Sequence, residues 1–127
     1  MSDQRQAILN PVFERSPVLI TLQLTDQADA PLAKVQLETV TLTLYDKRVP
    51  GEFINERDEQ NVLDANGGTV STDGVLTLVL GEDDQVLTSQ GHRKEDHVVL
   101  LKWTWIAGPG PGIKEITYPL INQVQVT

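Results

Sequence analysis

The clearest pattern along the chain is an alternation of apolar and polar residues over residues 17–25. Val18, Ile20, Leu22 and Leu24 occupy one parity, and the other parity holds Leu19 and three polar residues. A period of two is typical of a half-buried strand. We therefore predict a first strand over residues 17–25, followed by a turn at 26–31, where Asp and Pro favour chain reversal.

A second strand is predicted over residues 34–45, and its apolar parity changes on the way. Val35 and Leu37 lie on one parity, whereas the apolar residues from Val40 onward lie on the other. A change of phase by one residue indicates a β-bulge or a strand that moves between sheets. Residues 49–52 are predicted to form a turn, and residues 53–55 a short strand or edge.

The second half of the chain contains the strongest strand signals. Residues 69–71 and 75–80 flank an Asp-Gly turn, which is a hairpin signal. Residues 97–106 are apolar on both parities, as in a central strand, and Val99, Leu101, Trp103 and Trp105 share one face. A loop at 107–112 leads into a last strand at 113–126, which Pro119 confines to a sheet edge or interrupts locally.

No segment shows a sustained helical period, and six to eight short strands without helical crossovers indicate two packed antiparallel sheets. We predict an immunoglobulin-like antiparallel β-sandwich of about seven strands, although a Greek-key or jelly-roll variant would show the same pattern. The sandwich is assigned to residues 17–127 and an extended N-terminal arm to residues 1–16. The expected core contains Trp103 or Trp105 together with Ile20, Leu42, Leu44, Leu76, Leu78 and Leu101.

The arm is polar apart from Ile8, Leu9, Val12 and Phe13, and proline residues prevent a helix there. These four apolar residues show no periodicity that would bring them into the core of the domain. We expect them to bind a neighbouring subunit, because arms of this type add backbone hydrogen bonds to a sheet edge of their partner. In the alternative, Val12 and Phe13 fold back over one end of the sandwich.

Composition restricts the partners. The 127 residues include 10 Lys and Arg against 18 Asp and Glu, giving a formal net charge of −8 at pH 7. Such a field repels phosphate backbones and anionic lipid surfaces, so we expect neither nucleic acid nor a membrane as partner. No signal peptide or apolar membrane span is recognisable, and we expect a protein made in the cytoplasm. The absence of cysteine removes disulfides and thiolate chemistry.

Catalytic chemistry has few candidates. His92 and His97 are the only histidines. We interpret His92 as a loop residue and His97 as the first residue of a strand, rather than either as a general base. We interpret the acidic clusters at residues 58–59, 82–84 and 95–96 as solvent-exposed turns. Asp64 and Asn66 resemble the start of a calcium loop, but the positions expected for further ligands hold Gly68 and Val75. We therefore expect no enzymatic activity, no cofactor and no metal site.

Aromatic residues offer one alternative site. Trp105 and Tyr118, together with the glycine- and proline-rich loop at 108–112, would form a stacking platform for a sugar if their rings were exposed. Trp103 favours the core instead. The alternative function is thus an immunoglobulin-like module that recognises carbohydrate or a host surface.

Five segments together resemble a known group of proteins. They are LTLYD at 42–46, FINER at 53–57, NVLDANG at 61–67, DGVLT at 73–77 and HVVLLKWTW at 97–105. Over roughly residues 35–121 the chain resembles small immunoglobulin-like proteins encoded among the virion structural genes of tailed bacteriophages. The resemblance contains no catalytic residues.

This resemblance implies a structural part of the particle, either a decoration protein on the head or an accessory protein of the neck that joins head and tail. The implied partners are other virion proteins, namely major capsid, portal or neck proteins, and we expect a homo-oligomer within the particle. The implied location is the virion, after synthesis in the cytoplasm of the bacterial host.

Overall fold

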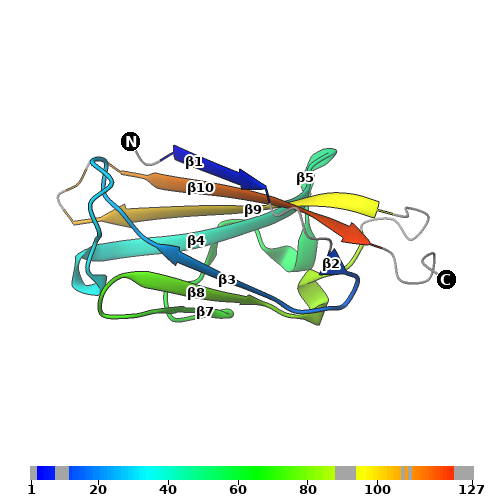
Figure 1. The fold of residues 1–127 in the computed structure, drawn as a ribbon, viewed down its shortest axis with the longest axis horizontal. Helices are drawn as coiled ribbons and strands as arrows, with labels where there is room; N and C mark the ends of the chain where they lie inside the picture. The colour runs from blue at the N-terminus through cyan, green and yellow to red at the C-terminus, as the bar shows by residue number, and fades with distance from the viewer. Residues whose placement is uncertain (1–2, 8–11, 88–93, 107, 109, 122–127) are drawn as a thin grey trace.

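Two β-sheets packed face to face make up the molecule. The computed structural model describes residues 3–7, 12–87, 94–106, 108 and 110–121. Within these ranges the helical turns are three short 3-10 segments, at Lys34–Gln36, Ile54–Glu56 and Glu82–Asp84. Figure 1 shows an elongated body in which the strands run along the long axis. The predicted all-β sandwich is confirmed.

The larger sheet contains seven strands. Its main order is β1 (Asp3–Ala7), β10 (Gly112–Ile121), β9 (Lys94–Trp105), β4 (Leu37–Asp46) and β5 (Val49–Phe53), while β2 (Val12–Phe13) pairs with β10 and β6 (Gln60–Asn61) pairs with β4. The strand predicted to be central, β9, lies between β10 and β4. Its apolar residues on both parities are explained by this central position.

The smaller sheet has three strands, in the order β3 (Val18–Gln23), β8 (Val75–Leu80) and β7 (Gly68–Val70). The predicted hairpin joins β7 to β8. Gly74 in its turn has φ of 80°, and a Cβ there would overlap the carbonyl of Leu32. Glycine is therefore required at this position by both backbone conformation and close packing.

The strand order is that of an immunoglobulin-like domain. In such domains strands A, B, E and D form one sheet and C, F and G the other. Here β3, β8 and β7 hold the positions of B, E and D, and β4, β9 and β10 those of C, F and G. The first strand differs, because β1 lies beside β10 in the larger sheet and leaves the smaller sheet with three strands.

The change of apolar parity in the second strand is a register shift. Leu37 pairs with Trp105, but the next partner pair is Thr39 with Thr104, so one residue of β4 is left over between them. After this bulge Val40, Leu42 and Leu44 all face the core and are fully buried. The predicted bulge is confirmed, while residues 34–36 form a 3-10 turn that precedes the strand.

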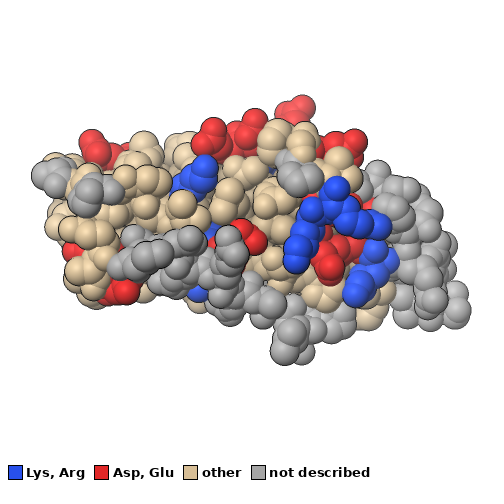
Figure 2. All heavy atoms as spheres, turned by 90° about the horizontal axis from the view of Figure 1, so that it is seen from above, with Lys and Arg blue, Asp and Glu red and all other residues tan. Residues whose placement is uncertain are grey.

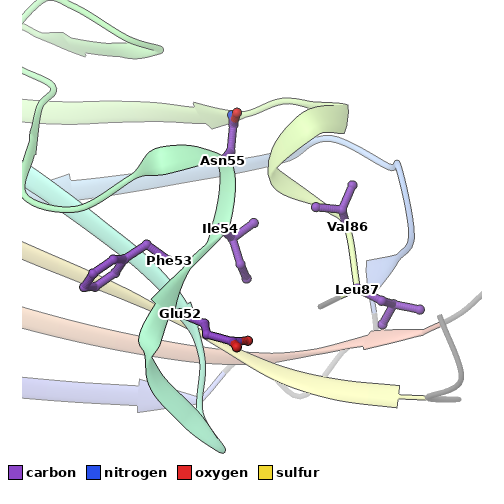
Figure 3. A pocket seen from close by; sticks show the side chains of 6 residues that line it. All are labelled: Glu52, Phe53, Ile54, Asn55, Val86 and Leu87. Atoms are coloured by element: carbon purple, nitrogen blue, oxygen red, sulfur yellow. The ribbon is translucent and has the colours of Figure 1, made fainter. Parts of the chain in front are cut away.

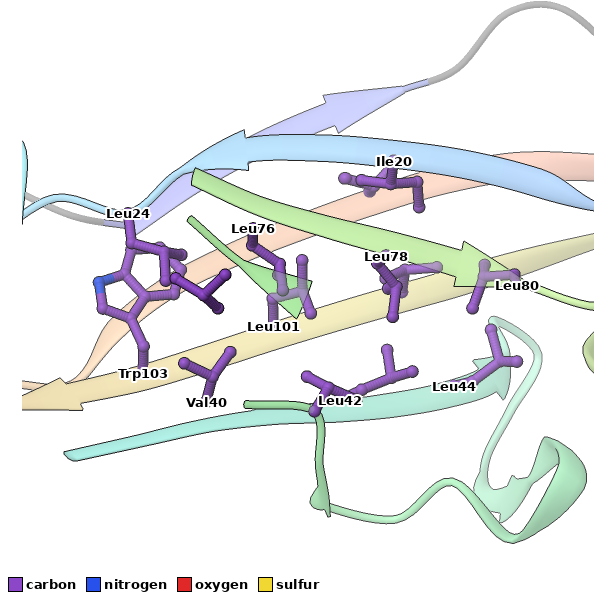
Figure 4. Close-up of a cluster of buried hydrophobic side chains, with 14 of the residues drawn as sticks. Ile20, Leu24, Val40, Leu42, Leu44, Leu76, Leu78, Leu80, Leu101 and Trp103 are labelled. Atoms are coloured by element: carbon purple, nitrogen blue, oxygen red, sulfur yellow. The ribbon is translucent and has the colours of Figure 1, made fainter. Parts of the chain in front are cut away.

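The core fills the space between the sheets with aliphatic side chains around one indole ring (Figure 4). Trp103 is 1% exposed, and its Nε1 donates a hydrogen bond of 2.8 Å to the carbonyl oxygen of Thr25. The residues predicted for the core are buried: Ile20, Leu42, Leu44, Leu76, Leu78, Leu101, Trp103 and Trp105. Burial of these side chains is the main stabilising contribution to the fold.

Two predicted local structures were wrong. Residues 49–52, predicted as a turn, belong to strand β5, whose edge position tolerates Pro50. The segment predicted to be a strand at 53–55 turns at Ile54, because Asn55 and Glu56 adopt positive φ values of 55° and 58°. These conformations end an extended strand.

The N-terminal segment also differs from the expected extended arm. Strand β1 pairs in parallel with residues 113–117 of β10, and β2 pairs in parallel with Leu120 and Ile121. Pro119 lies within β10, pairs in register with Asp96 of β9, and belongs to a strand that has β1 on its other side, so the predicted edge position or interruption at this residue was wrong. The segment is therefore part of the larger sheet, and residues 1–16 are not a separate arm in the described ranges.

Candidate functional site

The proposed sugar platform is absent, because its two rings are buried. Trp105 lies in the core, and Gly108 packs so closely on its indole that a Cβ there would overlap the ring. Tyr118 is fully buried, and its hydroxyl donates a 2.8 Å hydrogen bond to Oε1 of Gln85. Neither ring offers a face to a ligand, so the alternative prediction of a ligand platform at these two residues was wrong.

The four residues predicted to bind a neighbouring subunit have different surroundings. Val12 is half-buried and packs against the core of its own chain, while Phe13 is 41% exposed. Ile8 and Leu9 lie outside the described residues. Val12 therefore follows the alternative in which this segment folds back, and of the two described residues Phe13 is the one with an accessible surface.

Ionisable side chains occupy the interior at the end of the sandwich where β4 ends and β9 begins. His97 and Glu95 are both buried, and His97 Nε2 lies 2.9 Å from Glu95 Oε1. Asp46 is also buried and pairs across the sheet with His97. Buried charges of this kind need compensation by an opposite charge or by hydrogen bonds.

Arg48 supplies part of that compensation. Its Nη2 atom lies 3.6 Å from Asp46 Oδ2 and 4.0 Å from Glu95 Oε2. Figure 2 shows Lys and Arg side chains gathered around acidic ones toward this end of the molecule. His97 is fully buried, so its imidazole is not exposed to solvent. The other imidazole, His92, lies outside the described residues.

A second buried ion pair fixes the loop after β5 against the 3-10 turn at Glu82–Asp84. Arg57 donates from Nε and Nη2 to the two carboxylate oxygens of Asp84, at 2.6 and 3.0 Å. Its Nη1 donates to Gln60 Oε1 and to the carbonyl of Asn66. This bidentate geometry is the strongest form of an Arg–carboxylate contact.

A pocket of about 390 Å³ lies beside this ion pair. Phe53, Ile54 and Glu52 come from the end of β5 and the following turn, and Val86 and Leu87 come from the opposite segment. Figure 3 shows Ile54 on one wall, with Val86 and Leu87 on the other. Asn55 also lines the pocket, so its walls combine four apolar side chains with one carboxylate and one amide.

The contacts of Asp64 do not support a calcium-binding loop at residues 64–66. Its carboxylate forms an ion pair with Lys34 and accepts a 2.9 Å hydrogen bond from the amide of Val70. These contacts hold the pKa of Asp64 below its ordinary value, with the Lys34 hydrogen bond as the largest cause. Asp64 therefore stabilises the turn that leads into β7.

Among the described residues, no three His, Asp or Glu side chains are placed to hold a metal ion together. The described ranges also contain no helix long and apolar enough to cross a membrane.

The outer face of the smaller sheet is the surface that sequence analysis missed. Alternation along β3, β8 and β7 directs these side chains outward: Leu19, Thr21, Gln23, Thr69, Val75, Thr77 and Val79. None of them is charged, and the directly paired Leu19 and Val79 are 66% and 46% exposed. The face thus presents two adjacent exposed apolar side chains among uncharged polar ones. The exposed Leu19 on the polar parity was the sequence signal for it.

Comparisons with known proteins do not identify a family. No family model matches the chain, and no curated protein matches it. A crystal structure of a sialyltransferase from Photobacterium damsela aligns with 94% of this chain at 17% identity and a TM-score of 0.41. The chain spans 18% of the length of that protein. A similarity of this size carries no argument about activity.

Proposed function

We propose that this protein is a non-enzymatic structural component of a tailed bacteriophage particle, which binds neighbouring virion proteins as a head decoration or neck protein. The proposal combines the resemblance of five sequence segments with one surface property. The partners would be major capsid, portal or neck proteins, and the chain would be present in many copies.

The observation that carries the proposal is the uncharged outer face of the three-stranded sheet. On a chain with net charge −8, a face that exposes Leu19 and Val79 among threonines is suited to protein contact, because its burial displaces water from apolar surface without desolvating charge. Of the two histidines, His97 is enclosed by its own fold, and His92 lies outside the described residues. The uncharged face is thus the feature that supports a binding role.

Co-purification with particles tests the proposal. When particles of a phage that encodes this protein are purified on a density gradient, the protein should remain with them at a fixed copy number per particle. Leu19→Asp combined with Val79→Asp places charge on the face and should reduce that copy number, whereas Val35→Asp, at an exposed site before β4, serves as the matched control.

The competing function, recognition of carbohydrate, predicts a different result. The isolated protein would then bind a defined glycan on an array and would be absent from washed particles. Because Trp105 and Tyr118 are buried, we expect no glycan binding. Glycan binding without particle association would overturn the proposal.

A further inference from the structure

Strand β3 has a free edge. In the described part of the chain it pairs with β8 on one side only. Gln23 is opposite Val75, and the amide of Leu24 donates to Gly74 O at 3.0 Å, which fixes the phase of the antiparallel ladder. By alternation Val18, Ile20 and Leu22 bond to β8, so the backbone N–H and C=O groups of Leu19, Thr21 and Gln23 point away from it.

The other three sheet edges carry features that prevent strand addition, and β3 lacks them. Strand β1 contains Asp3 and Arg5, β5 contains Pro50 and a register shift, and β7 has three residues. Charge, proline, irregularity and short length all protect an edge. The sequence VLITLQ of β3 has none of these within its six residues.

The sandwich is also incomplete at this edge. The inward-facing Val18 and Leu22 of β3 are half-buried, although their partners on β8, Leu80 and Leu76, are both 0% exposed. In immunoglobulin-like domains a strand A commonly occupies the position next to strand B, but here the first strand pairs with β10. One added strand would cover the exposed parts of Val18 and Leu22.

Charge at the ends of the edge describes the strand that fits there. At the Val18 end, Arg15 lies 3.2 Å from Asp83 and offsets its charge. At the Gln23 end, the side-chain amide of Gln23 donates to the carbonyl of Asp73, and Asp26 and Asp29 follow in the next turn. An incoming segment is therefore favoured if it is uncharged along β3 and basic at the Gln23 end.

We propose that the β3 edge binds an extended segment of a neighbouring protein as a fourth strand, uncharged in the middle and with Lys or Arg at the end nearest Gln23. The proposal rests on the proposed function for the origin of that neighbour. Main-chain hydrogen bonds to Leu19, Thr21 and Gln23 give affinity, and the acidic end selects the partner and its direction.

A synthetic peptide tests the edge directly. The probe is nine residues of alternating Val and Thr with two Lys residues at one terminus, and the comparison peptide has Glu in place of Lys. We expect the Lys peptide to bind and to slow amide hydrogen exchange at Leu19, Thr21 and Gln23. We expect the Glu peptide to bind at least about tenfold more weakly than the Lys peptide.

Proline variants separate backbone pairing from side-chain contact. Thr21→Pro removes an N–H that β8 does not use, and should weaken peptide binding by about tenfold or more. Thr21→Ala keeps the N–H and should bind within about threefold of the parent, since only a partly exposed methyl and hydroxyl are lost. If Thr21→Pro does not give a cooperative melting curve, Leu19→Pro replaces it, because this variant also removes an N–H that points away from β8.

Three outcomes would overturn the proposal: no binding of the Lys peptide, exchange protection at β7 or β5 instead of β3, or a concentration-dependent dimer with β3 amides already protected.

The particle assay distinguishes the fourth-strand proposal from the proposed structural function. If the parent and Thr21→Pro associate with particles equally, the fourth-strand proposal fails and the structural function stands; if neither associates, the structural function fails.

Discussion

At the scale of single residues, Trp103 has the largest enclosed side chain in the described core. Trp103→Ala should lower the free energy of unfolding by roughly 3–5 kcal/mol, because it opens a cavity and leaves the carbonyl of Thr25 without the indole donor. Chemical denaturation measures this loss. Ile106→Ala, at a 60% exposed site, is the control and should change stability by less than about 0.5 kcal/mol. Equal small losses for both variants would mean that the indole is not part of the core.

Tyr118 gives a prediction with a defined pH dependence. Burial raises the pKa of its hydroxyl, so the folded state favours the neutral phenol. The resulting stability is fully present below about pH 10 and falls as the pH rises further, because the unfolded chain then releases the proton that the folded chain retains.

Tyr118→Phe should therefore lower stability at pH 7 by about 1–3 kcal/mol, since Gln85 Oε1 loses its donor, and should flatten the loss of stability above pH 10. Denaturation curves at pH 7 and at about pH 11 check both effects. If the free energy of unfolding fell as steeply above about pH 10 in Tyr118→Phe as in the parent protein, this result would contradict a buried phenol.

The pair Arg57–Asp84 predicts a difference between buried and exposed ion pairs. Arg57→Met leaves the Asp84 carboxylate buried without its guanidinium and should cost roughly 3–5 kcal/mol. The matched control is Arg15→Met, which breaks the exposed pair with Asp83 and should change stability by about 0–1 kcal/mol. Similar losses in the two variants would remove the argument that Arg57 fixes the loop beside the pocket.

At the scale of the elements, period two predicted β3, β4, the β7–β8 hairpin and β9, because each has one face on the core. The change of parity before Val40 even located the bulge. Strands β1 and β2 were missed, because they gain stability from pairing with β10 and their residues show no alternation. The burial of Tyr118 was missed because its hydroxyl bonds to Gln85, a polar residue far away in the sequence.

The pairing of β1 with β10 predicts what removal of the first seven residues does. Deletion of residues 1–7 should lower the free energy of unfolding by roughly 1–3 kcal/mol, because a five-residue ladder is lost. Thermal melting of the truncated and full chains measures it. An unchanged melting temperature would restore the original expectation of an extended arm that only a neighbouring subunit orders.

At the scale of the whole molecule, the two ends of the sandwich differ in chemistry. Aliphatic side chains surround Trp103 toward one end, and Asp46, Glu95 and His97 are buried toward the other. The two sheets are also unequal, with seven strands against three. This inequality leaves the β3 edge and the neighbouring uncharged face as the surface through which the domain is proposed to bind its neighbours.

Cryo-electron microscopy of phage particles that contain this protein tests that account most directly. The map should place the domain against a neighbouring virion protein, with an extended segment of the neighbour hydrogen-bonded along residues 18–23 and a basic residue near Asp26 or Asp73. A map in which every copy leaves the β3 edge and the face around Leu19 and Val79 in solvent would contradict the account.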